Sequence, residues 1–342
     1  MAAFSRYKNK SGTPLPASLI VCAHNEEENL RRLLPLLYEQ NHPDYEIIIV
    51  DDRSYDGTYD FLLEEAAKNS KVKIVKVNEK PENFNGKKYA LTLGIKAAKK
   101  ENIILTDADC TPASNNWLTQ MSSQLASPKT INLGFSYYEQ QKGFLNTFIR
   151  FDTLWTAIQY LGMALVGKPY MGVGRNLAYT RSLFIENKGF TAHMKVMGGD
   201  DDLFVNQHTN KGNTAITLGE DTIVYSKPKT SWKLFFRQKI RHLAVGKHYK
   251  SGNKVILGLF SLSHIFFWLI LGVQTGMQVE LYFVIGSFFI KTLLLYLTFI
   301  IACKKLGVRF NLWSLIFLDI IFVFYYSIIG LKALFTKRVR WI

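Results

Sequence analysis

Asp107 and Asp109 are the first residues in this sequence whose types and spacing suggest chemistry. They follow a short apolar run, residues 103–105, and a single residue separates them. In an extended chain, residues i and i+2 point the same way, so both carboxylates can converge on one object. Clustered carboxylates repel one another unless a cation lies between them, and their oxygen atoms suit Mg²⁺ or Mn²⁺. A cap on the following turn is the alternative for such a pair.

Acidic residues gather a second time at Asp200, Asp201 and Asp202, directly after two glycines. Three adjacent carboxylates repel one another and therefore favour a neighbouring cation. A solvated acidic helix cap is the alternative interpretation. Farther along, Gln238 and Arg241 lie three residues apart, hence on one face of a predicted helix, and arginine suits bidentate contact with phosphate.

Strands and helices alternate in the part of the chain that leads to these groups. Near-continuous apolar runs are typical of parallel strands buried on both faces, and they occupy residues 17–23 and 46–50. A third strand is predicted at residues 72–77 and a fourth at residues 103–106. Helical patterns lie between them, at residues 26–40, 58–69 and 87–100. Asn25 and Glu28 resemble a capping box at the start of the first helix. The alternation predicts an α/β domain with a mostly parallel sheet.

Ligands of such a sheet bind outside the carboxyl ends of its strands. The polar residues that fall at those ends are Asn25, Asp51, Asp52, Asp107 and Asp109. Beyond the fourth strand, we expect a helix at residues 116–126 and a strand at residues 131–138. Residues 144–166 form an aromatic-rich amphipathic segment, which is either a core helix of the domain or a helix in a membrane interface.

The apolar residues are unevenly distributed. Up to about residue 249 the sequence resembles a soluble globular protein, and three apolar runs follow at residues 255–275, 281–303 and 312–335. Each has roughly the ~20 residues needed to span a bilayer as a helix. Lys291 and Asp319 are charges inside these runs, and such charges are costly unless paired. We therefore expect them to pair inside the helix bundle.

Net charge and cysteine content indicate the surroundings. The chain has 42 basic and 27 acidic residues, a net charge of +15, and the excess is concentrated just before the first apolar run. Such a cluster indicates contact with the anionic cytoplasmic leaflet. Nucleic acid is the rival partner and is not expected, because no recognition module accompanies the charge.

Three scattered cysteines fit neither a disulfide framework nor a zinc site, as in a reducing cytosol. The polar start, residues 1–16, is not expected to be a secretory signal peptide.

Six short motifs follow one another in a characteristic order: Val50-Asp51-Asp52-x-Ser54-x-Asp56-Gly57-Thr58, Gly86-Lys87-x-x-Ala90-Leu91-x-x-Gly94, Asp107-Ala108-Asp109, Gly174-x-Asn176-x-Ala178, Gly198-Gly199-Asp200-Asp201-Asp202-Leu203 and Gln238-x-x-Arg241. The series resembles the family 2 inverting glycosyltransferases with a GT-A fold. The similarity is greatest to the membrane-bound branch, with its ceramide glucosyltransferase-like enzymes and polysaccharide synthases. It implies a polar tail (1–16), a GT-A domain (17–250) and a C-terminal membrane domain (251–342).

The resemblance implies roles for the residues that bind the donor. Asp107 and Asp109 match the metal and donor carboxylates, with Asp109 as the more direct ligand. Asp52 matches the position that contacts the nucleoside, and Lys87 is expected to meet the phosphates or the uracil edge. A solvated helix start is the alternative for Lys87. The other donor-binding candidates are Asn25, Glu26, Gln238 and Arg241.

For the catalytic base, the resemblance points to the acidic triplet. An inverting single displacement needs one base for the acceptor hydroxyl. Asp200 takes that position, with Asp201 beside it, and the assignment within the triplet stays open because Gly199 stands where the family usually has glutamate. His242 replaces the usual tryptophan after Arg241, which counts against processive synthesis.

The resemblance therefore implies a membrane-bound inverting glycosyltransferase of the inner or plasma membrane, with its catalytic domain in the cytoplasm. It would use Mg²⁺ or Mn²⁺ and move a sugar from a nucleoside-diphosphate sugar, expected to be a UDP-sugar, to a lipid or lipid-linked glycan. A processive polysaccharide synthase and a non-catalytic nucleotide-sugar-binding subunit of a membrane complex are the alternatives.

The membrane topology stays open in the sequence. A cytoplasmic domain makes the loop at residues 304–309 cytoplasmic if the first two runs both span, as the positive-inside rule prefers. A spanning third run would then place Lys337, Arg338 and Arg340 outside, which the rule disfavours. Either the third run is re-entrant or interfacial, or one of the earlier runs does not span.

Overall fold

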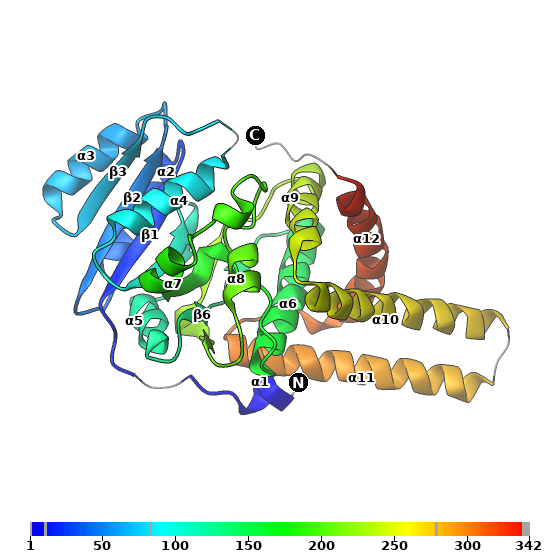
Figure 1. Cartoon of the computed structure of the whole chain (residues 1–342). Helices are drawn as coiled ribbons and strands as arrows, with labels where there is room; N and C mark the ends of the chain where they lie inside the picture. Colours follow the sequence, from blue (N-terminus) through cyan, green and yellow to red (C-terminus); the bar gives the residue numbers. More distant parts are fainter. Residues whose placement is uncertain (1, 10–11, 83, 278–279, 337–342) are drawn as a thin grey trace.

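The structure is a computed structural model, and it describes residues 2–9, 12–82, 84–277 and 280–336. An α/β domain lies on one side, and long apolar helices extend from it on the other (Figure 1). The residues Lys337, Arg338 and Arg340, on which the topology question depends, lie outside the described residues.

The central sheet has seven strands in the order β3-β2-β1-β4-β8-β6-β9. Four neighbouring parallel strands form one side of it: β1 (Ala17–Ala23), β2 (Tyr45–Asp52), β3 (Val72–Val77) and β4 (Asn102–Asp107). β8 (Leu177–Thr180) pairs antiparallel with β4 and with β6 (Ile131–Leu133), while β9 (Thr214–Ile216) is parallel to β6. The predicted mostly parallel sheet is confirmed. Its central strands β1, β2 and β4 are almost entirely buried apolar runs, as is typical of parallel strands covered on both faces, whereas the edge strand β3 carries Lys73 and Lys76.

A second, three-stranded sheet consists of β5 (Cys110–Pro112), β10 (Val224–Ser226) and β7 (Ser136–Tyr138). The prediction of one strand over residues 131–138 is therefore wrong, because β6 and β7 belong to different sheets. Gly134 lies between them, where an added Cβ would be 2.4 Å from the side-chain carbonyl carbon of Asn176. Only a residue without a side chain lets the chain pass so close while it changes sheets.

The helices between the strands are α2 (Glu27–Tyr38), α3 (Thr58–Lys68), α4 (Gly86–Ala97) and α5 (Trp117–Ser122). They confirm the predicted helices with ends shifted by a few residues. The capping box is wrong, because Glu26 is the N-cap of α2 and makes no side-chain cap. Asn25 instead has a left-handed φ of 56°, and its Oδ1 accepts the amide of Tyr55 at 2.9 Å.

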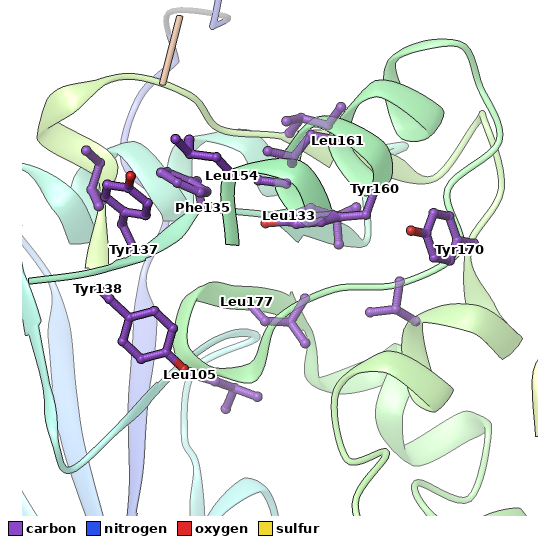
Figure 2. Close-up of a cluster of buried hydrophobic side chains, with 14 of the residues drawn as sticks. Leu105, Leu133, Phe135, Tyr137, Tyr138, Leu154, Tyr160, Leu161, Tyr170 and Leu177 are labelled. Atoms are coloured by element: carbon purple, nitrogen blue, oxygen red, sulfur yellow. The ribbon is translucent and has the colours of Figure 1, made fainter. Parts of the chain in front are cut away.

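Helix α6 (Phe144–Leu165) is a core helix, which resolves the alternative that the sequence left open. Figure 2 shows its residues Leu154, Tyr160 and Leu161 beside Leu133 and Phe135 of the sheet region. The Tyr160 hydroxyl donates to the Gly134 carbonyl at 2.7 Å. The same helix contacts the apolar helices through Phe151, whose ring lies 5.5 Å from that of Phe299. α6 thus joins the sheet to the long apolar helices.

Each of the three apolar runs forms a helix: α10 (Ser251–Gly276), α11 (Leu281–Leu306) and α12 (Leu315–Phe335). All three are long and apolar enough to cross a membrane. The predicted Lys291–Asp319 pair is confirmed, and α10 adds two further contacts to the buried Asp319 carboxylate. Trp268 Nε1 donates to it at 3.0 Å, and His264 Nε2 lies 3.4 Å from its other oxygen.

The remaining helices connect these parts. Near the N-terminus, α1 (Ala2–Arg6) buries Phe4 and packs against α6 and α11. Two short helices follow β8, α7 (Arg181–Glu186) and α8 (Asp202–His208). Last in the α/β domain is the basic α9 (Trp232–Val245), which packs against α12.

Candidate active site

A cavity of about 790 Å³ lies at the carboxyl ends of β1, β2 and β4 and reaches α6 and α9. Nine of the ten candidate residues line it: Glu26, Asp52, Lys87, Asp107, Asp109, Asp200, Asp201, Gln238 and Arg241. Asn25 is the exception, and its contact with Tyr55 shapes the turn after β2 instead. The strand register explains the convergence, since Cys22 pairs with Asp107 on one side and with Val50 on the other.

Lys87, in the first turn of α4, links the two acidic groups. Its Nζ lies 2.8 Å from Asp107 Oδ1 and 3.4 Å from Asp200 Oδ2. Burial alone would lower the pKa of Lys87, but the two carboxylates together raise it well above its ordinary value. Lys87 is therefore a fixed cation between the Asp107 carboxylate at the end of β4 and the Asp200 carboxylate in a loop. The alternative, a solvated lysine at the start of a helix, is wrong.

Its neighbour Lys88 has a different environment and a different task. The side chain is fully buried, and Nζ donates to the carbonyls of His193 at 2.6 Å and Val196 at 3.0 Å. Burial lowers the pKa of Lys88 to about 8. These bonds hold the loop that leads to Asp200, so α4 positions both the cation and the acidic triplet that it faces.

The three aspartates of the triplet have separate partners. Asp201 accepts the amide of Asp202 at 2.7 Å as the N-cap of α8, and its other oxygen accepts the amide of Gly174 at 2.7 Å. Asp202 accepts the Tyr249 hydroxyl at 2.8 Å, and burial, followed by the Asp201 charge, raises its pKa well above the usual range. Asp200 is the member that pairs with Lys87 across the cavity. The helix-cap interpretation is therefore correct for Asp201. Asp200 is not the cap of α8 and lines the cavity instead.

Gly199, where the resemblance leads one to expect glutamate, has a φ of 77°. An added Cβ would lie 2.6 Å from Leu203 Cδ1 and 3.1 Å from Val245 Cγ1. In this chain the left-handed conformation and the neighbouring apolar side chains both favour glycine.

Asp107, Asp109 and Cys110 have ligand atoms that all lie within 4.8 Å of one another. The two carboxylates are the oxygen donors that a hard cation prefers, whereas a thiolate favours softer metals. Cys110 is buried, with its Sγ 3.5 Å from Asp109 Oδ1. The donor set therefore fits Mg²⁺ or Mn²⁺ on the two aspartates.

Arg175 lines the cavity as well, and sequence reasoning missed it because it occupies the unspecified position between Gly174 and Asn176. Its guanidinium lies 4.7 Å from the ring centre of Tyr138 and bonds to Ser226 Oγ. Buried Asn176 fixes the turn, donating to two backbone carbonyls at 2.7 Å. In the sequence, the glycine-rich turn around Arg175 was the signal that could have identified it.

The charges of these groups act together on Asp107. Burial alone would raise the pKa of Asp107, but Lys87, and then Arg175 and Arg241, hold it below its ordinary value. Negative and positive groups thus alternate around the carboxyl ends of the strands. Beside them, Asp52 accepts a bond from Arg53 Nε at 2.7 Å.

The far wall of the cavity is formed by α6 and α9. Asp152 of α6 and Lys239 of α9 form a buried ion pair with 2.5 Å between Oδ2 and Nζ. Sequence reasoning missed this pair as well, although Asp152 is one of two charges in its aromatic helix. Gln238 and His242 also line this wall, and burial lowers the pKa of His242 well below its usual value.

Comparison with known proteins decides the family. The family model of glycosyl transferase family 2 matches residues 18–195, just over half of the chain. The chain belongs to glycosyl transferase family 2. The probable glycosyltransferase YdaM of Bacillus subtilis is 26% identical over 237 residues, which cover 66% of this chain and 53% of that protein. The undecaprenyl-phosphate 4-deoxy-4-formamido-L-arabinose transferase of Aeromonas hydrophila is 33% identical over 96 residues, 27% of this chain and 28% of that protein. The family 2 chain thus spans about half or less of these relatives.

Among solved structures, the mannosyltransferase PcManGT from Pyrobaculum calidifontis, in complex with GDP-Man and Mn²⁺, resembles this family 2 chain with a TM-score of 0.62. The match covers 98% of this chain and 93% of that one at 17% identity. The likeness confirms the predicted GT-A-like fold, followed by C-terminal apolar helices.

Proposed function

We propose that this family 2 member is a membrane-bound inverting glycosyltransferase that moves a sugar from a nucleoside-diphosphate sugar, expected to be a UDP-sugar, to a lipid or lipid-linked acceptor. The observation that carries the proposal is the placement of Lys87 between Asp107 and Asp200. It brings the carboxylate pair at the end of β4 and the acidic loop before α8 into one cavity.

The donor half of the cavity lies at the strand ends. Asp107 and Asp109 would hold Mg²⁺ or Mn²⁺, and the PcManGT complex with GDP-Man and Mn²⁺ supports both a metal and a nucleotide sugar. When bound, the cation supplies neutralisation of the negative charge that develops on the diphosphate leaving group. Lys87 and Arg175 add fixed positive charge on the same side of the cavity, and Asp52, which also lines it, would contact the nucleoside.

Asp200 serves as the general base in this proposal. The acceptor hydroxyl oxygen attacks the anomeric carbon while the bond to the diphosphate oxygen breaks, and its electron pair leaves with the nucleoside diphosphate. The hydroxyl proton passes to the Asp200 carboxylate. Asp201 and Asp202 are engaged by backbone amides and by Tyr249, so they are less available. Lys87 orients Asp200 toward the reacting atoms.

The membrane side of the cavity supports a lipid acceptor. Its wall of α6 and α9 contacts the apolar helix α12, and Lys227 and Lys229 line the same region. The similarity to an undecaprenyl-phosphate sugar transferase points in the same direction. Unpaired cysteines and the basic cluster before α10 support a cytoplasmic domain at the inner or plasma membrane. Residues 17–250 would carry the chemistry and residues 251–342 the attachment.

The experiment is transfer of radiolabelled sugar to extracted lipid by the purified full chain in detergent. We expect metal-dependent formation of a single-sugar product with inverted anomeric configuration. Asp200→Asn should lose at least about 100-fold in rate. Asp201→Asn keeps one oxygen acceptor for the helix cap and loses the bond from the Gly174 amide, so we expect a smaller loss of rate. If Asp200→Asn and Asp109→Ala were both as active as the unaltered chain, the site assignment would be refuted. Long polymeric product would favour a processive synthase, and donor binding without turnover a non-catalytic subunit.

A further inference from the structure

Helix α12 is oriented differently from the other apolar helices. α10 and α11 form a hairpin that projects away from the α/β domain, whereas α12 runs crosswise to the hairpin and beside α9 (Figure 1). Length and apolar composition alone would allow each of the three to span a membrane. The contacts of α12 distinguish it from the other two.

Helix α12 touches the α/β domain along its length. Near its start, the ring of Phe317 lies 6.0 Å from that of Phe144 in α6. Farther along, the ring of Tyr325 is stacked 5.8 Å from that of Phe235 in α9. In contrast, α10 has no buried residue, while eight of the 21 residues of α12 are buried.

Both ends of α12 are also tied to the domain. In the segment before the helix, Arg150 of α6 donates to the Arg309 carbonyl at 2.8 Å, and an added Cβ at Gly307 would lie 2.4 Å from the Glu220 amide nitrogen. Directly after the helix, Lys247 Nζ donates to the Thr336 carbonyl at 2.9 Å.

These ties conflict with a spanning helix. Twenty-one residues at about 1.5 Å each give roughly 31 Å, the thickness of the hydrocarbon core. A helix of this length that crossed the bilayer would have one end on the far side, away from the domain.

The outward face of α12 is an apolar stripe formed by Phe317, Phe324, Ile328, Leu331 and Phe335, each more than half exposed. At 3.6 residues per turn these side chains lie within about 60° of one another. The stripe extends over the length of the helix and faces away from the domain. On the domain side, the neighbouring α9 exposes basic residues, which suit anionic head groups.

We propose that α12 lies in the plane of the membrane, within the leaflet that faces the α/β domain, with lipid acyl chains covering its apolar stripe. The proposal rests on the membrane attachment of the proposed function and not on its chemistry. Lys291 and Trp268 then join Asp319 of the in-plane helix to the hairpin and leave its carboxylate paired in the apolar surroundings. The arrangement removes the conflict with the positive-inside rule that a spanning third helix creates.

The sidedness of the chain end gives the first test. A protease-cleavable tag is fused after residue 342 of the full chain in sealed membrane vesicles. Labelling of Glu64→Cys on α3 by an impermeant maleimide, compared with the unaltered chain, identifies vesicles with the domain outside. We expect the protease to remove the tag from those intact vesicles. A tag that resists until detergent is added would overturn the proposal.

The depth of the helix gives the decisive test. Nitroxide side chains are introduced one at a time, as a non-canonical amino acid, at Phe317, Phe324 and Leu331, and the depth of each label in the bilayer is measured. The three positions lie on one face and cover about 21 Å of helix. An in-plane helix predicts depths that agree within about 5 Å. A spanning helix predicts that at least two of the three labels differ by about 10 Å or more, and this result would overturn the proposal. Labels with the same spacing on α10, at exposed residues Val255, Leu262 and Leu269, calibrate the gradient of a helix along the membrane normal. Neither measurement needs a sugar donor, so failure here is distinct from failure of the proposed chemistry.

Discussion

Replacing Lys87 with methionine tests whether one cation holds the two acidic groups in a reactive arrangement. The variant keeps most of the aliphatic volume but leaves Asp107 and Asp200 to repel one another. At 3–4 Å and an effective dielectric constant of about 20, each contact has a gross energy of roughly 4–6 kcal/mol. Solvent screening reduces this figure, because the side chains of Lys87 and Asp107 are 28% and 31% exposed. We expect a net loss of about 3 kcal/mol of transition-state stabilisation, hence a fall in kcat/KM of roughly 100-fold.

The assay is the initial rate of transfer to lipid at saturating metal, with the nucleotide sugar that supports turnover. Lys68→Met is the matched control, because Lys68 lies on α3 with its side chain 65% exposed and should leave the rate unchanged. Thermal unfolding of each variant shows that the fold is intact. A kcat/KM of Lys87→Met within threefold of the unaltered chain would refute the reasoning.

Three further perturbations follow from the geometry. Lys239→Met should destabilise the fold by roughly 3–5 kcal/mol because it leaves buried Asp152 without its partner, and a smaller loss in the Asp152→Asn/Lys239→Met double variant would show the coupling in a denaturant cycle. Burial lowers the pKa of Lys88 to about 8, and unfolded lysine titrates near about 10.4, so the folded state binds fewer protons between these values. The free energy of unfolding should then rise across that pH window by about 3 kcal/mol relative to Lys88→Met, and parallel pH profiles would count against it. Gly199→Glu should lower the unfolding midpoint and the activity, since the new side chain meets Leu203 at a left-handed φ; a variant as stable as the unaltered chain would contradict this.

How well the sequence predicts the fold depends on how local the determining forces are. β1 has the predicted ends because a strand buried on both faces shows as a continuous apolar run. β3 also has the predicted ends, although it is an edge strand that carries Lys73 and Lys76. The break between β6 and β7 was missed because it depends on the approach of Asn176 to Gly134, residues 42 positions apart. Asn25 was misassigned as a cap because its side chain bonds to the turn after β2, which propensity does not reveal.

The candidate site shows the same division. Nine of the ten residues chosen from motifs line one cavity, because the motifs sit at strand ends that the sheet brings together. The missed residues depend on distant partners. Lys88 is buried because two carbonyls more than a hundred residues away accept hydrogen bonds from its ammonium group, and Asp152 meets Lys239 only when α6 and α9 pack. The sequence indicated where the site would form but not the contacts that hold it.

Release of nucleoside diphosphate by the detergent-solubilised full chain tests the central claim most directly. A panel of UDP- and GDP-sugars is supplied with and without Mn²⁺, and with and without a total lipid extract. The account predicts turnover of one donor that needs both metal and lipid and is lost in Asp200→Asn. No release of diphosphate from any donor, or release that is unchanged in Asp109→Ala and Asp200→Asn, would contradict it.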